Sequence, residues 1–317
     1  MKPMMVEVTR GGIVESEHRV HVAIASHDGI EVQGDGERLT FPRSAAKLMQ
    51  ALPLVESGAA HRAGLTPEQL ALACASHGGE SAHVNAVEAW LIQLGLTEAH
   101  LECGPSWPMH EPSGHVRSAQ GLSASLLCNC CSGKHAGFMT LAKDQGVDVA
   151  GYIQREHPVQ QQIEATIGEV LDTPVGVFGV DGCGIPTYAN RLMDLAAGLQ
   201  RLAKATGVRG DAVKTLAAAH RSHPFMVGGT DRCCTDINGA LADGMVKYGA
   251  EGVYFGLFPK AGLGIAMKAE CGTVRAVEVA MVRVLKQHGL LPADALPQWD
   301  SVSLKNRAGL VVGEIRV

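Results

Sequence analysis

A serine and a lysine three residues apart, Ser44 and Lys47, have the clearest potential for chemistry in this sequence. Pro42 favours a helix start, and a spacing of three places both side chains on one helical face. Apolar neighbours disfavour a charged ammonium, and a neutral amine beside a hydroxyl can act as general base for a serine nucleophile. The S-x-x-K pattern is short and also arises by chance, so it gains meaning only with the motifs that follow.

Two later motifs offer a second serine and a second lysine. The sequence CASHGGE at 74–80 places Ser76 beside His77 in a loop, as a proton relay or an ST-turn. The sequence FPKAG at 258–262 places Lys260 between apolar strands, either as a catalytic group or as a solvent-facing hairpin residue. The order S-x-x-K, serine loop, K-x-G is similar to the three-motif arrangement of serine β-lactamases and penicillin-binding proteins. The second motif departs from S-D-N, and the third departs from K-T-G.

Cysteines gather in two glycine-rich segments, CNCCSGKHAG at 128–137 and GVDGCGIP at 179–186. Thiolates with a further nitrogen or oxygen donor suit Zn²⁺, and the simpler alternative is a set of buried, inert cysteines. The C-x-x-C pair at 128–131 has no second pair that would complete a zinc knuckle. The chain has 9 cysteines, several of them adjacent, which favours reduced thiols over a disulfide framework.

Composition limits the classes of function. The chain has 317 residues, 46% hydrophobic and 19% charged, so it can bury a large core in one or two domains. A net charge of -5 and 4% aromatic residues exclude the basic, aromatic surface typical of nucleic-acid binding. We find no targeting segment and no membrane-spanning run, so we expect no membrane partner and a cytoplasmic location.

The secondary structure that must position these residues changes along the chain, from strands at both ends to helices in the centre. The N-terminal 40 residues alternate as strands do, and strands are expected again at 252–258, 262–268, 272–277 and 309–317, around a helix at 279–287. Helical spacing fills the centre, with a start at Thr66 and Pro67 and further helices at 82–94, 159–171, 190–205 and 211–220. We therefore predict an α+β fold, with an antiparallel sheet from both termini and an inserted helical region. The predicted domains are a discontinuous sheet domain, 1–60 plus 225–317, and a mainly helical domain, 61–224.

Four motifs together resemble the asparaginase II family, the rhizobial-type, class 3 group of L-asparaginases. They are PRSAAK at 42–47, ACASH at 73–77, CSGKHAG at 131–137 and VDGCGIP at 180–186. The resemblance runs over nearly the whole chain. It implies a serine β-lactamase-like fold, an amidohydrolase that converts L-asparagine to L-aspartate and ammonia, and a homodimer.

The same resemblance implies the site residues. It matches two Ser–Lys pairs, Ser44 with Lys47 and Ser76 with Lys260. It also implies a metal, usually zinc, held by residues that match Cys131, Lys134 and Cys183, with Asp181 alongside. The neighbouring thiols at 128 and 130 leave open which cysteine of this segment faces the metal.

The expected substrate contacts follow from charge. The Arg43 guanidinium suits the α-carboxylate of the substrate and Asp181 suits its α-ammonium. Lys134 is also expected to bind the substrate. In the expected mechanism Ser44 attacks the side-chain amide, Lys47 takes its proton, and Ser76 with Lys260 completes a relay. The zinc ion would assist substrate binding more than chemistry.

Three alternatives stay open. The first is a β-lactamase or peptidase-like acyl hydrolase on the same scaffold. The second is a glutaminase, since one methylene changes binding by only about 1–3 kcal/mol. The third is a zinc-binding protein without catalytic activity.

Overall fold

The computed structural model describes residues 1–317 and divides them into two compact units. The sheet unit consists of Met1–Ala45, Ala189–Lys204 and Asp236–Val317. The helical unit consists of Ala46–Tyr188 and Ala205–Thr235. The sheet unit is discontinuous, as the predicted sheet domain is, but it also includes residues 189–204, which lie within the predicted helical domain. None of the helices is both long enough and apolar enough to cross a membrane.

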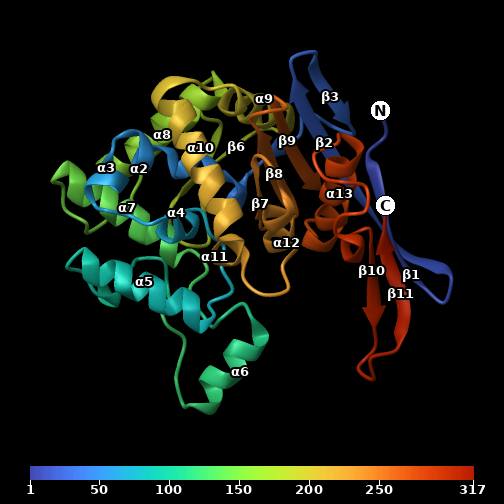
Figure 1. The fold of residues 1–317 in the computed structure, drawn as a ribbon, viewed down its shortest axis with the longest axis horizontal. Helices are drawn as coiled ribbons and strands as arrows, with labels where there is room; N and C mark the ends of the chain where they lie inside the picture. Colours follow the sequence, from blue (N-terminus) through green and yellow to red (C-terminus); the bar gives the residue numbers. More distant parts are fainter. The chain divides into compact units, whose positions relative to one another are not determined.

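The sheet unit contains an eight-stranded antiparallel sheet built from both ends of the chain (Figure 1). Its strand order is β10-β11-β1-β2-β9-β8-β7, with β3 also paired to β2. Because β1 pairs with β11 and β2 pairs with β9, the predicted fold class is confirmed. The strands are β1 (Met4–Arg10), β2 (Ile13–Ser26), β3 (Gly29–Gln33), β7 (Met245–Gly249), β8 (Val253–Phe258), β9 (Leu263–Ala269), β10 (Ser301–Lys305) and β11 (Val311–Arg316).

Two helices of this unit, α9 (Leu192–Ala203) and α13 (Val274–Gln287), pack on the sheet. Both contact β2, β8 and β9, and every residue of β8 is buried, so both faces of that strand are covered. The packing of α9 on β9 depends on Gly264, because a Cβ atom there would lie 2.3 Å from the backbone nitrogen of Gln200. The short helix η3 (Pro297–Trp299) precedes β10.

One predicted strand is wrong. Residues 272–277 were expected to be extended, but α13 begins at Val274 after Thr273 at its N-cap. Its buried residues recur with helical spacing, as at Ala276, Val277 and Ala280, and this period outweighs the strand preference of the valines. The helix predicted at 279–287 is the C-terminal part of α13.

The helical unit is arranged around α7 (Ser132–Gln145), whose residues 132–142 are all buried. It contacts α2, α3, α4, α5 and α8. Gly133 permits the close packing with α4, since a Cβ atom there would lie 2.6 Å from the carbonyl oxygen of Leu72. The other elements are α1 (Lys47–Gln50), α2 (Leu52–Glu56), α3 (Ala59–Arg62), α4 (Pro67–Ala73), α5 (Ser81–Gln93), η2 (Glu98–His100), α6 (Glu111–Ala119), α8 (Pro158–Leu171), β5 (Val177–Val180), α10 (Gly207–Ser222) and α11 (Pro224–Gly228).

The predicted helix starts and spans agree with the structure. Thr66 and Gln69 form a capping box at the start of α4, with Pro67 in its first turn. The helices expected at 82–94, 159–171, 190–205 and 211–220 correspond to α5, α8, α9 and α10. Three elements, η1 (Arg43–Ala46), β6 (Pro186–Arg191) and α12 (Cys233–Ala240), run across the division between the units. A small sheet has the order β4-β6-β5, where β4 is Leu39–Thr40.

Candidate active site

Ser44 lies in the turn η1, against the end of strand β7 in the sheet unit. A Cβ atom at Gly249 would lie 2.8 Å from the carbonyl oxygen of Pro42 and 3.3 Å from the backbone nitrogen of Ser44. A glycine at this position therefore lets the backbone of the turn rest directly on the strand. Arg43, which precedes the serine, has a φ of 50°, the left-handed region that non-glycine residues rarely occupy. Ser44 itself is half-buried.

The buried lysine nearest to this turn along β7 is Lys247, two residues before Gly249. Its side chain is fully buried, donates to the carbonyl oxygen of Tyr248 at 2.6 Å, and lies 4.0 Å from the centre of the Tyr248 ring. Residues two apart on a strand share a face, so Lys247 and Gly249 face the same side of β7. The sequence interpretation did not include Lys247, although K-Y-G at 247–249 also fits the K-x-G pattern.

Lys260, which was expected to be catalytic, is exposed in the turn between β8 and β9. Gly249 pairs with Val253 at one end of the β7–β8 hairpin, whereas Lys260 follows Phe258 at the opposite end of β8. At ~3.3 Å per strand residue, Val253 and Phe258 are about 17 Å apart. Lys260 is therefore remote from the turn that carries Ser44, whereas Lys247 is buried on the strand beside that turn.

In the helical unit, Lys47 and Ser76 form a buried pair. Lys47 begins α1, directly after the turn that holds Ser44, and its side chain is fully buried. Its Nζ atom donates to Ser76 Oγ at 3.0 Å, to Cys131 Sγ at 3.3 Å and to the carbonyl oxygen of Ala75. The structure thus brings together the lysine of the first expected pair, Lys47, and the serine of the second, Ser76.

The loop that carries Ser76 is fixed by hydrogen bonds of its neighbours. The Ser76 amide donates to the carbonyl oxygen of Val227 at 3.0 Å, and the His77 amide donates to that of Cys130 at 3.2 Å. The Gly79 amide donates to His77 Nδ1 at 3.1 Å. On the other side of the ring, His77 Nε2 lies 3.0 Å from Ser132 Oγ. These contacts hold the backbone on both sides of Ser76.

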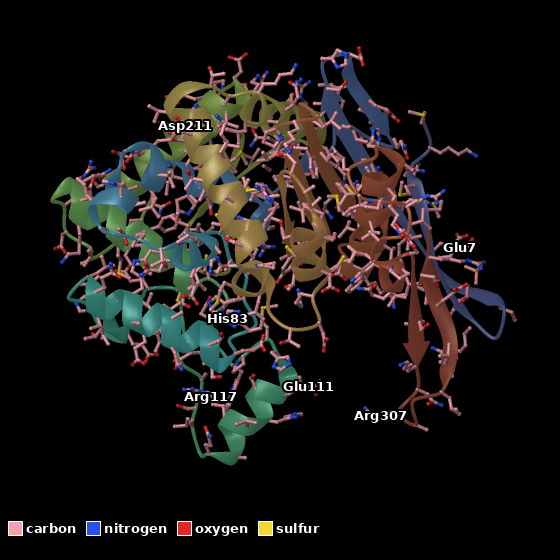
Figure 2. All side chains as sticks on the ribbon, in the orientation of Figure 1. Glu7, His83, Glu111, Arg117, Asp211 and Arg307 are labelled. Atoms are coloured by element: carbon pink, nitrogen blue, oxygen red, sulfur yellow. The ribbon has the colours of Figure 1, made fainter.

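The same contacts make His77 a neutral imidazole. Ser132 Oγ donates to the carbonyl oxygen of Leu127, so it accepts from His77 Nε2, while Nδ1 accepts from the Gly79 amide. His83, labelled in Figure 2, stacks on His77 with ring centres 4.9 Å apart. Burial, then the nearby His83 and Lys47, lowers the pKa of His77 well below 6.5. His77 therefore positions the Ser76 loop and is not a proton carrier near neutral pH.

Cys131, Lys134 and Cys183 form a second cluster, which we call the thiol cluster. Cys131 is the N-cap residue of α7 and Lys134 lies in the first turn of that helix, where its Nζ donates to Cys183 Sγ at 2.9 Å. Hydrogen bonds with the thiols of Cys130 and Cys183, and then the charges of two lysines, lower the pKa of Cys131 well below 9.0. The same hydrogen bond and burial raise the pKa of Cys130. Of these three cysteines, Cys131 is therefore the one whose pKa is shifted toward the thiolate form.

The donors of the thiol cluster fit a zinc ion. Two thiol sulfurs and a lysine amine supply the sulfur and nitrogen ligands that Zn²⁺ prefers, provided that Lys134 binds as the free amine. No group of three His, Cys, Asp or Glu side chains that could hold a metal is present, so a third ligand would have to be lysine. Of the three cysteines left open by the sequence, Cys131 belongs to the cluster, Cys130 Sγ lies 3.8 Å from its sulfur, and Cys128 lines a separate cavity.

The L-asparaginase II family model matches residues 6–317, nearly the whole chain. The chain belongs to the L-asparaginase II family. This membership makes it an amidohydrolase-family protein and confirms the resemblance that the four motifs indicated. No curated protein sequence matches this L-asparaginase II family member.

Solved structures similar to this family member include β-lactamases. A structure of Mglu in its native form is 13% identical with a TM-score of 0.48, covering 92% of this chain and 66% of that one. A β-lactamase from Mycobacterium bovis is 13% identical with a TM-score of 0.42, covering 86% and 95%. The D-alanine carboxypeptidase AmpC from Burkholderia cenocepacia is 12% identical with a TM-score of 0.40, covering 84% and 93%. The chain spans 66% of the native form of Mglu and 63% of its L-glutamate binding form.

Asp181, expected to bind substrate in this L-asparaginase II family member, lies in the turn that presents Cys183. Its backbone amide donates to the carbonyl oxygen of Ile185 at 2.9 Å, and its Oδ1 accepts from the Gly182 amide at 2.8 Å. Burial lowers the pKa of Lys134, but Cys183, Cys131 and Asp181 outweigh burial and raise it overall. The carboxylate of Asp181 is therefore close enough to influence the charge of the thiol cluster. Arg43, expected to bind the α-carboxylate, is half-buried in the turn of Ser44.

Proposed function

We propose that this protein hydrolyses L-asparagine to L-aspartate and ammonia through a Ser–Lys nucleophile. The observation that carries the proposal is the fully buried Lys47, whose Nζ is 3.0 Å from Ser76 Oγ and which begins the helix directly after the Ser44 turn. A buried amine beside hydroxyl groups is the arrangement that activates serine without a histidine base. The neutral, buried His77 supports a lysine as the base, since it lacks a free ring nitrogen.

In the proposed reaction, Ser44 Oγ attacks the side-chain amide carbon of asparagine and its proton passes to Lys47 in the free-amine form. The C–N bond then breaks, and the leaving nitrogen receives a proton through Lys47 and Ser76, which releases ammonia and leaves an aspartyl ester on Ser44. Water hydrolyses the ester by the reverse proton path, so the net change is the addition of one water. Lys247 takes the place that Lys260 was expected to have, as a buried lysine on the strand beside the Ser44 turn.

The substrate contacts are part of the same proposal. Arg43, directly before the nucleophile, would pair with the α-carboxylate, because guanidinium and carboxylate form paired hydrogen bonds. Asp181 would accept from the α-ammonium, with Lys134 beside it. Cys131, Lys134 and Cys183 would hold Zn²⁺, which when bound supplies positive charge for the polar end of the substrate. We further propose a cytoplasmic homodimer, which sedimentation equilibrium and cell fractionation would test.

The deciding experiment is an ammonia-release assay on the purified protein with L-asparagine and L-glutamine side by side. A chromogenic cephalosporin in a parallel assay tests the β-lactamase alternative. We expect turnover of asparagine, less turnover of glutamine and none of the cephalosporin. If glutamine or the cephalosporin is turned over in preference to asparagine, that compound would be assigned as the substrate instead. If none of the three compounds is turned over, the better interpretation is that the protein binds zinc and has no catalytic activity.

A further inference from the structure

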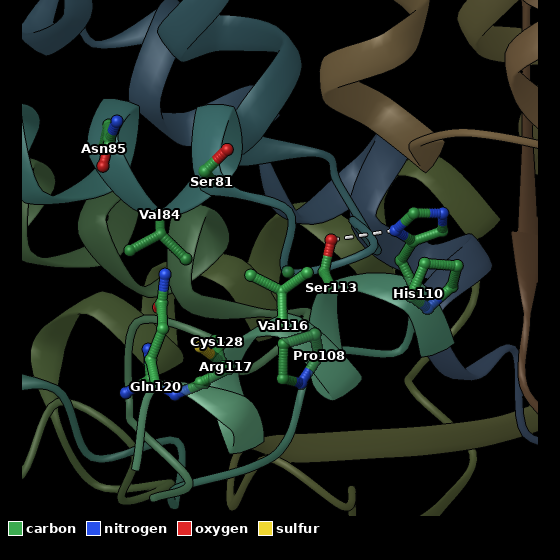
Figure 3. Close-up of a pocket in the computed structure, with 12 residues that line it drawn as sticks. Ser81, Val84, Asn85, Pro108, His110, Ser113, Val116, Arg117, Gln120 and Cys128 are labelled. Atoms are coloured by element: carbon green, nitrogen blue, oxygen red, sulfur yellow. Dashed lines mark hydrogen bonds between the residues drawn. The ribbon is translucent and has the colours of Figure 1, made fainter. Parts of the chain in front are cut away.

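A cavity of about 620 Å³ lies in the helical unit between the start of α5 and the helix α6 (Figure 3). None of the residues assigned above to catalysis or to the thiol cluster lines it. Its walls are formed by Gly79, Ser81, Val84, Asn85, Pro108, His110, Pro112, Ser113, Val116, Arg117, Gln120 and Cys128. This volume is within the range of about 300–1,000 Å³ typical of small-molecule sites.

The shape of the cavity is held by contacts of its own walls. The His110 amide donates to the carbonyl oxygen of Gly78 at 2.9 Å, which ties the segment before α6 to the loop before α5. A Cβ atom at Gly79 would lie 2.9 Å from both Pro108 Cα and the carbonyl oxygen of Cys128. His110 Nδ1 is hydrogen-bonded to Ser113 Oγ at 2.9 Å (Figure 3). Because these walls contact one another directly, the cavity is formed before any ligand binds.

The lining has one permanent positive charge and no carboxylate. Arg117 uses its Nε to donate to the carbonyl oxygen of Ser123 at 2.6 Å, and its two terminal amino groups make no bond within the chain. Glu80 and Glu111 are next to lining residues along the chain, but neither is part of the lining. Glu80 accepts from both the amide and the hydroxyl of Thr230, and its carboxylate lies 3.7 Å from Nδ1 of the lining residue His110. A carboxylate ligand would therefore meet a partner for its charge in the lining, whereas the lining itself offers no carboxylate to an ammonium group.

The remaining walls combine apolar surface with uncharged polar groups. Val84 faces the cavity from α5, and Val116 faces it from α6 (Figure 3). Pro108 and Pro112 add further apolar surface, and Asn85 and Gln120 can donate hydrogen bonds. A bare inorganic anion would leave most of this surface without contact. An apolar body of several carbon atoms would cover it.

We propose that this cavity binds a small monocarboxylate with an apolar body, whose carboxylate pairs with Arg117. The charge of the lining selects such an acid over a neutral analogue and over a zwitterionic amino acid of the same size. This site is separate from the proposed asparaginase chemistry, and its test requires no turnover.

Isothermal titration calorimetry of the full chain with benzoate tests the proposal, with benzamide and L-phenylalanine as the neutral and zwitterionic comparisons. We expect one benzoate per chain and at least about tenfold weaker binding of both comparisons, the difference of a lost charge-assisted pair. Arg117→Gln should weaken benzoate binding by a similar factor, and Val84→Trp should block it by filling the cavity. His115→Ala is the matched control, because His115 is on α6 but does not line the cavity.

Folding is not expected to obscure the result, since α6 has no buried residue and Arg117→Gln removes a single hydrogen bond, to the Ser123 carbonyl oxygen in the loop that follows. Circular dichroism of each variant would verify this. Absence of benzoate binding at millimolar concentration would overturn the proposal. Equal binding of benzamide, or wild-type binding by both Arg117→Gln and Val84→Trp, would also overturn it, because the ligand would then occupy another surface.

Discussion

The helical unit contains two buried lysines whose surroundings differ. Lys47 is surrounded by oxygen and sulfur acceptors, among them the hydroxyl of Ser76, whereas Lys134 faces the thiol of Cys183 with Asp181 nearby. A hydroxyl can pass a proton onward to a substrate, while thiols are good ligands and hold charge in place. The same residue type is thus suited to proton transfer in one cluster and to binding in the other.

Cys131 connects these two clusters. Its sulfur lies 3.3 Å from Lys47 Nζ, and it also shares a hydrogen bond with Cys183. A change in the charge of the thiol cluster will therefore change the electrostatic environment of the Lys47 amine. The predictions below test whether chemistry and binding are indeed divided in this way.

The largest effect is expected for Ser44→Ala. Loss of the nucleophile removes the covalent route, so kcat should fall by at least about 10³-fold with the fold unchanged. Ammonia release and circular dichroism would measure both, and Ser118→Ala on α6 is the control. An acyl adduct trapped on Ser76 in the Ser44→Ala variant would transfer the nucleophile role to the second serine.

Lys247 and Lys260 allow a direct comparison of a buried and an exposed lysine. Lys247→Met should lower kcat by about 10²-fold, the lower range for loss of an acid–base or electrostatic group. Lys260→Met should leave kcat and KM unchanged, because that side chain is exposed in a distant turn. The reverse ranking in steady-state kinetics would restore the original assignment of Lys260.

The thiol cluster should affect binding more than chemistry. Cys183→Ala is expected to remove the metal and to raise KM by about tenfold, with a smaller change in kcat. Elemental analysis and steady-state kinetics measure these effects, and the exposed Cys271→Ala is the matched control. Metal content and KM that both stay at wild-type values would show that the cluster has no role in binding.

The smallest effect concerns stability at mildly acidic pH. His77, His83 and His135 are buried, and burial lowers the pKa of each below 6.5. Below pH 6.5 the unfolded chain binds protons on these imidazoles that the folded chain does not, so stability falls as pH falls. The slope approaches about 1.4 kcal/mol per pH unit for each histidine that stays neutral.

Urea unfolding at pH 7.0, 6.0 and 5.5 measures this slope. His77→Gln should make it shallower, because it removes one titrating group, while His115→Ala on the surface should not change it. A free energy of unfolding that is constant over this range would contradict the neutral, buried state of these histidines.

Much of the fold was predictable because it depends on local signals. The capping box at Thr66 and the helical spacing of α5, α8 and α10 are properties of short segments. The helix α7 was not predicted, since its first eleven residues, 132–142, are buried on every side and show no polar face. Its position at the centre of the unit is a property of the whole fold rather than of its own sequence.

The site was predictable where motifs are long and not where they are short. The segments around Ser44, Ser76 and Cys131 were recognised, but K-x-G occurs twice, at 247–249 and 260–262. The two lysines become distinct only in the structure, where Lys247 is buried on β7 and Lys260 is exposed in the turn after β8. Likewise, nothing in the sequence separates Cys131 from its neighbours, which become distinct only when α7 begins there.

The contact of Gly249 with the Ser44 turn has a consequence for how this protein tolerates change. The distance between the turn and the strand that carries Lys247 is set by backbone against backbone, with no side chain between them. Repacking of the surrounding core can therefore proceed without altering that distance. A single added methyl group at Gly249, by contrast, would overlap the Pro42 carbonyl oxygen and displace the turn itself. The absence of a side chain at this one position therefore sets the distance between the Ser44 turn and β7.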